Sequence, residues 1–378
     1  MKRKAARWLG TFAAATVLLT GCGAGTQSGS AASEAATGST EAVSEEAVGD
    51  AVTETEDAAE EASAGETEAL EETGDTALDY DGTTIRVGSL KGPTTMGLVN
   101  LMKDSDNGSS EGTYTFTMAS DPSEIVASVA SGDLDIAMIP ANLTSTLYNK
   151  TNGGVSVIDI NTLGVLYVVT GDESVESMAD LAGKTVLTTG QGATPEYAMN
   201  FLLKENGITD CTLEFHSEAT EIAALLKEDP GKIAVLPQPF ATAALLQNDA
   251  LRSAFSLTDA WDQAAGANGS RFLTGATIVR NDFLEEHPGA VSVFMKEHAA
   301  SADKANTDTE GTAELVAEYG IVEKAAVAAK ALPNCNIVCI TGEDMKTALS
   351  GYLQVLYDAD PTSVGGSLPG DEFYYTAE

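Results

Sequence analysis

The segment YTFTMASDPSEIVASVASGDLDIAMIPAN, residues 114–142, decides the fold class of this chain. Its first five residues alternate between apolar and polar side chains, which predicts a strand. Asp121 then precedes a proline and, three residues on, a glutamate, as the N-cap of a helix does. Gly132 ends that helix, and the apolar run in Asp135–Pro140 predicts a second, buried strand. Because strands and helices alternate over short connections, the segment predicts a mainly parallel sheet with helices on both faces.

The same alternation extends over the chain from residue 80 onward. A short strand at Ile85–Leu90 precedes the quoted segment, and a second series of strands and helices begins near Thr170. The last third is expected to be helical, because apolar residues at helical spacing follow Thr341–Asp344, which is similar to a capping box. The 299 residues of 80–378 fit either two domains or one large α/β unit with two lobes.

The N-terminus has the pattern of an export signal. Four basic residues precede the twelve-residue apolar stretch Trp8–Leu19, which is shorter than the roughly 20 residues of a membrane-spanning helix. The stretch therefore predicts a signal peptide over residues 1–21. Leu19-Thr-Gly-Cys22 resembles the lipobox of bacterial lipoproteins, which implies lipid on Cys22 and stable membrane anchoring. The alternative is a plain secretory signal with an incidental cysteine.

An acidic segment separates this signal from the α/β part. Gly23–Asp79 contains sixteen acidic and no basic residues and almost no large apolar ones, so we expect Cys22 and this segment, residues 22–79, to be a disordered tether. The remaining 41 of the 57 acidic residues stand against 16 of the 20 basic ones in residues 80–378. That excess of negative charge argues against nucleic acid and anionic lipid surfaces as partners.

The cysteines and histidines indicate no metal or cofactor. Cys335 and Cys339 fall in one expected strand, where their separation of about 13 Å is too long for a disulfide. We expect buried free thiols, with a bridge from Cys211 to either of them as the alternative. The three histidines are scattered, and no Cys/His pair has a recognised ligand spacing.

Four short motifs in this order resemble the solute-binding proteins of ABC importers. The motifs are Ile85-Arg-Val-Gly, Gly132-Asp-Leu-Asp-Ile-Ala, Asp180-Leu-Ala-Gly-Lys-Thr-Val and Arg280-Asn-Asp-Phe-Leu. Within that class the chain looks most like the group of thiamine-precursor, sulfonate and nitrate binders. The resemblance implies a two-lobed, type 2 periplasmic-binding-protein-like α/β fold with two hinge crossovers, near Leu166–Thr170 and Thr274–Val279, and a helical C-terminal third.

The resemblance also implies an organisation and a set of partners. Lobe 1 would comprise residues 80–168 and 275–378, and lobe 2 residues 169–274. A small solute would bind between the lobes and pass to an ABC permease with its ATPase, and the chain would be a monomer. The lipid on Cys22 would hold it at the outer face of the cytoplasmic membrane in a Gram-positive type of cell, or on the periplasmic side in a Gram-negative one.

The candidate binding residues follow from strand ends. In open α/β sheets, ligands lie beyond the carboxyl ends of strands, where helix N-termini offer free N–H groups. Four expected loops of this kind, together with one serine before a cap, contain the candidates. They are Gly92, Thr94, Thr95, Met96, Ser120, Pro140, Ala141, Asn142, Gly190, Gly192, Ala193, Thr194, Gln238 and Pro239. The alternative for each is a role in capping a helix alone, and Trp261 is expected either to stack on an aromatic ligand or to pack in the protein.

Three functions remain after these observations. The first is the importer receptor, for a small organic solute that is neutral or singly anionic, because the expected first-lobe loops contain no arginine clamp. The second is a sensory or adhesive lipoprotein that uses the same domain without transport. The third is an enzyme of the thiamine-pyrimidine synthesis type, whose cysteine-rich iron motif is not matched here. No catalytic residues are assigned.

Overall fold

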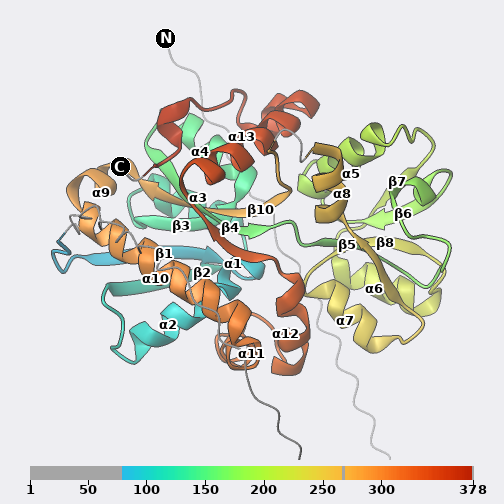
Figure 1. The fold of residues 1–378 in the computed structure, drawn as a ribbon, viewed down its shortest axis with the longest axis horizontal. Coiled ribbons are helices and arrows are strands. Elements are labelled where there is room, and N and C mark those ends of the chain that lie inside the picture. Colours follow the sequence, from blue (N-terminus) through green and yellow to red (C-terminus); the bar gives the residue numbers. More distant parts are fainter. Residues whose placement is uncertain (1–78, 266–268, 377–378) are drawn as a thin grey trace, which may run out of the picture. The chain divides into compact units, whose positions relative to one another are not determined.

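The described part of the chain is built around two β-sheets (Figure 1). The computed structural model describes residues 79–265 and 269–376, and all of these fall within one unit, Glu72–Glu378. The expected signal peptide, Cys22 and nearly the whole expected tether lie outside the described residues.

The first sheet has a parallel half and an antiparallel half. Its strands, in spatial order, are β11 (Ile337–Ile340), β4 (Val155–Leu163), β10 (Leu273–Arg280), β3 (Ile136–Pro140), β1 (Thr84–Leu90) and β2 (Thr113–Ala119). β1 pairs in parallel with β2 and β3, whereas β10 pairs antiparallel with β3 and β4, and β11 antiparallel with β4. The quoted segment thus forms the strand–helix–strand unit expected of it.

The second sheet repeats this division. Its strands, in spatial order, are β7 (Thr212–Phe215), β6 (Thr185–Thr188), β8 (Ile233–Pro237), β5 (Leu166–Thr170) and β9 (Arg252–Ser256). β6 pairs in parallel with β7 and β8, and β5 pairs antiparallel with β8 and β9. The expectation of a mainly parallel arrangement is therefore wrong. β5 and β10 enter their sheets from the other sheet, so they lack the crossover helix that makes successive strands of one sheet parallel.

Helices cover both faces of each sheet. Figure 1 shows α3, α4 and α13 over one face of the first sheet and α2 and α10 over the other. In the second sheet, α6 and α7 contact β8, while α8 contacts β5 and β9 and packs against α5. The helices are α1 (Pro93–Met96), α2 (Val99–Asp106), α3 (Pro122–Ala130), α4 (Ala141–Lys150), α5 (Thr194–Glu205), α6 (Ala219–Glu228), α7 (Phe240–Gln247), α8 (Leu257–Ala265), α9 (Asn281–Glu286), α10 (Pro288–Thr307), α11 (Thr309–Glu318), α12 (Ala325–Ala331) and α13 (Gly342–Ala359).

Of the two helix starts predicted from capping residues, the one at Asp121 is confirmed and the capping box at Thr341–Asp344 is wrong. Asp121 caps α3 as expected, because its side chain accepts a hydrogen bond from the Ser123 N–H at 2.8 Å. The expected capping box at Thr341–Asp344 is wrong, since the Thr341 side chain makes no capping hydrogen bond to a described residue. Gly342, the next residue, has a φ of 61°, and this left-handed entry is incompatible with the geometry of a capping box.

The chain passes between the sheets at two places that touch each other. It leaves the first sheet after Leu163 and joins the second at Leu166. It leaves the second sheet after Ser256 and re-enters the first at Leu273. Gly164, in the first passage, donates its N–H to the Phe272 carbonyl in the second at 2.7 Å. A side chain at Gly164 would collide with the Phe272 ring, so this contact requires glycine.

Trp261 is a core residue. It has no exposed surface, stacks on Phe272 with ring centroids 5.4 Å apart, and lies 5.8 Å from the ring of Tyr352 on α13. Its indole N–H donates to the Ser270 hydroxyl at 3.1 Å, which satisfies its polar atom. The expectation of packing is confirmed and that of ligand stacking is wrong, because a fully buried ring offers no face to a ligand.

Candidate functional site

The expected binding loops stand where helices follow strands. Gly92, Pro140, Ala193 and Pro239 are the N-cap residues of α1, α4, α5 and α7, which follow β1, β3, β6 and β8. In the described part of the chain, none of these four residues has a side-chain hydrogen bond that caps its helix. In the first turn of α7, however, the Thr242 N–H donates to Gln238 Oε1 at 3.3 Å, so only α4 and α5 among the longer helices begin without a side-chain acceptor from a described residue, as a solute site requires.

In the first of these loops, most of the side chains point into the protein. The Thr94 hydroxyl donates to the Leu90 carbonyl at 3.2 Å, and the Thr95 hydroxyl donates to the same carbonyl and lies 2.9 Å from the Ser89 hydroxyl. Thr95 and Met96 have no exposed surface. Gly92 is half-buried with a φ of 150°, which favours glycine. Contact with a solute from this loop would come from Gly92 and Thr94.

The other four candidate residues near the first sheet differ in exposure. Ser120 is exposed directly before the α3 cap. Pro140 is half-buried and Ala141 is buried at the start of α4. Asn142, also half-buried, donates from Nδ2 to the Ser363 carbonyl at 3.0 Å, so part of its side chain serves the C-terminal region.

The second sheet contributes one open loop and one tightly bonded loop. Gly190 and Gly192 have φ values of 76° and 71°, and Gly192 and Ala193 are exposed. Gln238 is only 4% exposed, and its Oε1 accepts from the Thr242 hydroxyl at 2.8 Å within the first turn of α7. Pro239 lines a cavity of about 630 Å³ that also includes residues of α6, α12 and the segment before α12.

Three hydrogen bonds connect residues near the second sheet to the C-terminal third. Thr194 Oγ1 lies 3.5 Å from the Tyr352 hydroxyl, and the Tyr197 hydroxyl donates to Asp360 Oδ2 at 3.2 Å. The Tyr167 hydroxyl donates to the Asn334 carbonyl at 2.9 Å. Sequence patterns indicated none of these pairs, because each joins residues more than 150 positions apart.

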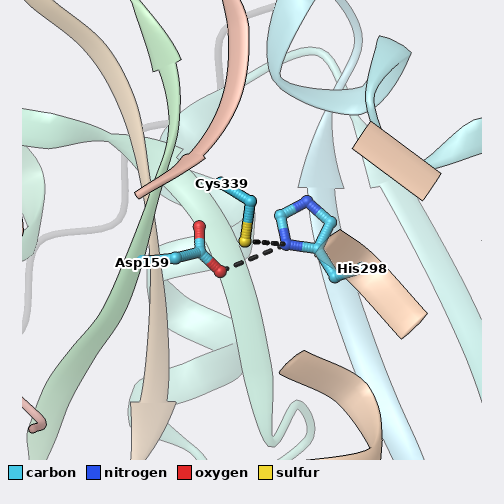
Figure 2. Close-up of side chains that lie close together, drawn as sticks. All are labelled: Asp159, His298 and Cys339. Carbon is cyan, nitrogen blue, oxygen red and sulfur yellow. Dashed lines mark hydrogen bonds and ion pairs between the residues drawn. The ribbon is translucent and has the colours of Figure 1, made fainter. Parts of the chain in front are cut away.

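A buried polar cluster lies on the face of the first sheet that α10 covers. Asp159 on β4 and His298 on α10 have no exposed surface, and Cys339 on β11 is half-buried. His298 Nδ1 lies 3.1 Å from Asp159 Oδ2 and 4.0 Å from Cys339 Sγ (Figure 2). No sequence pattern indicates this cluster, because 139 and 41 residues separate the histidine from its two neighbours.

Asp159 determines the charge of the cluster. Burial alone would lower the pKa of His298, but the Asp159 carboxylate, by attraction and hydrogen bonding, raises it to about 10. Asp159 Oδ1 accepts from the Thr277 hydroxyl at 2.6 Å, and Asn161 Nδ2 donates to that hydroxyl at 3.0 Å. The carboxylate is thus held by two further buried side chains.

The cluster does not have the geometry of a catalytic relay. A Cys–His–Asp relay uses both ring nitrogens, one toward the thiol and one toward the carboxylate. Here Asp159 and Cys339 both approach Nδ1, and Nε2 is buried without a hydrogen-bond partner among the described residues. The arrangement can hold a charge or an ion, but it provides no base for activating the thiol through the second nitrogen.

Comparison with known proteins agrees with this fold. The family profile described as ABC transporter, phosphonate, periplasmic substrate-binding protein matches residues 110–257, which include the quoted segment and all five strands of the second sheet. The expected resemblance to substrate-binding proteins of ABC transporters is confirmed. No curated protein sequence matches the chain at a significant level.

Solved structures of such proteins share the architecture. An ABC transporter structure from Parabacteroides distasonis is 23% identical, with a TM-score of 0.67, over 78% of this chain and 100% of that one. The periplasmic aliphatic sulphonate binding protein of Escherichia coli is 13% identical, with a TM-score of 0.62, over 78% and 92%. The alkanesulfonate-binding protein of Xanthomonas axonopodis pv. citri, bound to MOPS, is 13% identical, with a TM-score of 0.54, over 77% and 96%.

These likenesses establish the fold of the chain. It is α/β, with two sheets, and periplasmic-binding-protein-like, as expected from the sequence. The matching family profile and the sulphonate binding protein are both described as periplasmic binding proteins. Among the described residues, no helix combines the length and the apolar character that a membrane span needs. All three cysteines in the described residues are free thiols, so the alternative of a bridge from Cys211 is wrong.

Proposed function

We propose that the chain is the substrate-binding component of an ABC importer, which captures a small organic solute between two lobes and delivers it to a permease. The observation that carries this proposal is the pair of helix starts at α4 and α5. Each follows the carboxyl end of a strand, and neither has a side-chain cap in the described part of the chain. The proposed lobes comprise residues 80–168 with 275–378, and residues 169–274.

The pairing of the described arginines supports a neutral or singly anionic solute. Arg86 and Arg280 pair with buried Asp135, and Arg271 pairs with Asp262. Arg252 donates to two backbone carbonyls. Because none of these guanidinium groups lies in the proposed binding loops, a multiply charged anion would lack a bidentate partner there. Peptide N–H groups and threonine hydroxyls can bind one carboxylate, sulfonate or phosphonate monoanion.

The proposed location is the outer face of the cell membrane. Lipid on Cys22 would anchor the chain, the acidic tether would extend the lobes away from the bilayer, and the permease with its ATPase would be the partner. A Cys22→Ser variant should then leave the membrane fraction and fail to incorporate labelled fatty acid. Retention of both properties by the variant would contradict the anchor.

The proposed receptor is not an enzyme. The buried Cys–His–Asp cluster supports this part of the proposal, because Asp159 and Cys339 approach the same nitrogen of His298, which is not the geometry of a catalytic relay.

A thermal-shift screen of the full-length chain tests solute binding. The compounds are alkyl sulfonates, phosphonates, nitrate, thiamine precursors and amino acids. A solute present at 100 times its Kd adds about 2.7 kcal/mol to stability, which raises the Tm of a chain of this size by about 4 °C. A well-folded, ligand-free preparation that shows no shift across such a library would refute the receptor function.

A pair of threonine variants locates the solute. Thr194 and Thr309 are the first residues of α5 and α11, respectively. If the Thr194 hydroxyl binds the solute, Thr194→Val should weaken binding by about threefold to tenfold, the value of one hydrogen bond. Thr309→Val, at a helix start outside the proposed loops, should leave the affinity unchanged. Equal effects of the two substitutions would place the solute elsewhere.

A further inference from the structure

Asp159, His298 and Cys339 present three different metal-ligand types to one point. Their ligand atoms all lie within 4.8 Å of one another, and they come from β4, α10 and β11. In Figure 2 the carboxylate and the thiol both face the same nitrogen of the imidazole ring. We propose that this cluster is a binding site for a single Zn²⁺ or similar borderline-soft divalent cation, independent of the solute site.

The geometry is close to that of a tetrahedral zinc site. Zinc bonds of about 2.0–2.1 Å to nitrogen and oxygen and about 2.3 Å to sulfur place N and O about 3.3 Å apart, and N and S about 3.6 Å apart. The corresponding distances here are 3.1 Å and 4.0 Å. The Asp159 carboxylate and Cys339 Sγ lie within 4.8 Å of each other, so a bound cation would draw the half-buried Cys339 thiol closer to the other two ligands.

Hydrogen bonding alone leaves the cluster incompletely satisfied. A single proton on His298 Nδ1 can be directed at Asp159 or at Cys339, yet both side chains approach that nitrogen. A cation between the three atoms would bind all of them at once. Binding of the cation releases the proton on His298 Nδ1 and the proton of the Cys339 thiol. The resulting carboxylate, thiolate and neutral imidazole together balance a charge of 2+.

The surroundings orient two of the three ligands. Thr277 donates to Asp159 Oδ1, which leaves Oδ2 directed at the histidine, and Asn161 in turn donates to Thr277. The Phe294 ring stacks on the His298 imidazole at 5.5 Å with an interplanar angle of 14°. Such support of ligands by further hydrogen bonds is common in metal sites. Because Cys339 is half-buried, an ion can enter from that side, and a water can supply a fourth ligand.

The choice of metal follows from the ligand set. One thiolate, one imidazole and one carboxylate favour Zn²⁺ over Mg²⁺ and Ca²⁺, which prefer oxygen ligands alone. The test must therefore separate this site from the many surface carboxylates of a chain with a net charge of −37. Excess Mg²⁺ in all samples occupies the oxygen-only sites.

Protection of the thiol in the unmodified full-length chain is the first experiment. Alkylation of each cysteine is followed by mass spectrometry with and without Zn²⁺, in excess Mg²⁺. We expect Zn²⁺ to slow alkylation of Cys339 at least tenfold and to leave that of Cys211, which is also half-buried, unchanged. Unchanged alkylation of Cys339, or equal protection of both thiols, would overturn the proposal. Because no substitution is involved, the result does not depend on a variant that folds.

Metal titration of variants is the second experiment. Co²⁺ added to the full-length chain should give a thiolate-to-cobalt charge-transfer band with a stoichiometry of one, absent in Cys339→Ser and retained in Cys211→Ser. Thr277→Val, which removes the support of Asp159, should weaken Zn²⁺ binding by about 10–100-fold. The control is His287→Gln, which changes an exposed histidine–aspartate pair. A band that survives in Cys339→Ser, or binding unaffected by Thr277→Val, would refute the site, whatever the outcome of the solute screen.

Discussion

Replacement of Gly164 by alanine should destabilise the chain at the point where its two passages between the sheets meet. A Cβ at this position would lie 2.5 Å from Thr258 Oγ1 and 2.8 Å from Phe272 Cε1, and closer still to Phe272 Cδ1. The obstacles are not free to move. Phe272 is buried and stacks on Trp261, and the Thr258 hydroxyl donates to the Gly164 carbonyl at 2.8 Å.

The magnitude follows from the cost of overpacking. An added methyl group that displaces buried neighbours costs typically 1–3 kcal/mol. For about 300 ordered residues, this loss lowers the Tm by about 2–5 °C. Denaturation of the full-length chain in urea, followed by the fluorescence of buried Trp261, measures the change directly, because Trp261 contacts the displaced Phe272 ring.

A matched glycine and a double-mutant cycle test the reasoning. Gly231→Ala adds the same methyl group where the nearest atom is 3.3 Å away, and its free energy of unfolding should stay within about 0.5 kcal/mol of the wild type. Phe272→Leu removes the obstacle, so its effect combined with Gly164→Ala should be less than additive. Equal stability of the Gly164 and Gly231 variants, or full additivity with Phe272→Leu, would refute the proposed clash.

Two further predictions concern single side chains. Burial raises the pKa of the Cys335 thiol to about 12, so its contribution to stability is complete below the unfolded pKa of about 8.5 and is lost as the pH rises toward 12. Between pH 8.5 and 10, urea denaturation should show the wild type losing stability relative to Cys335→Ala, and a constant difference would contradict this. Asp121→Ala should cost about 1 kcal/mol through loss of the α3 cap, whereas Thr341→Ala should cost less than about 0.5 kcal/mol. Similar losses from these two variants in the same assay would show that the Asp121 bond is not a stabilising cap.

Some strands could not be predicted from local sequence. Val155–Leu163 forms β4, yet it lacks the alternation of a half-exposed strand, because all nine of its residues are buried. Asp159 and Asn161 also interrupt its apolar run. The antiparallel pairing of β4 with β10 follows from the path of the chain between the sheets, which the residues of neither strand encode.

The candidate site was also predictable only in part. The loops at the starts of α1, α4, α5 and α7 were predictable, because glycine, proline and threonine at a strand end act over a few residues. The directions of their side chains were not. Thr95 and Gln238 have the polarity expected of ligand-binding residues, but in the tertiary structure both are buried, and their side chains are hydrogen-bonded to groups within six residues along the chain.

Local interactions therefore account for the α/β alternation, the cap at Asp121 and the resemblance to solute-binding proteins of importers. Each of these depends on backbone conformation and on apolar spacing within one element, and such information is present in a short stretch of sequence. The convergence of Asp159, His298 and Cys339 is of a different kind. Only the packing of β4, α10 and β11 brings these three side chains together, because burial of apolar surface, and not any spacing along the chain, determines which distant elements meet.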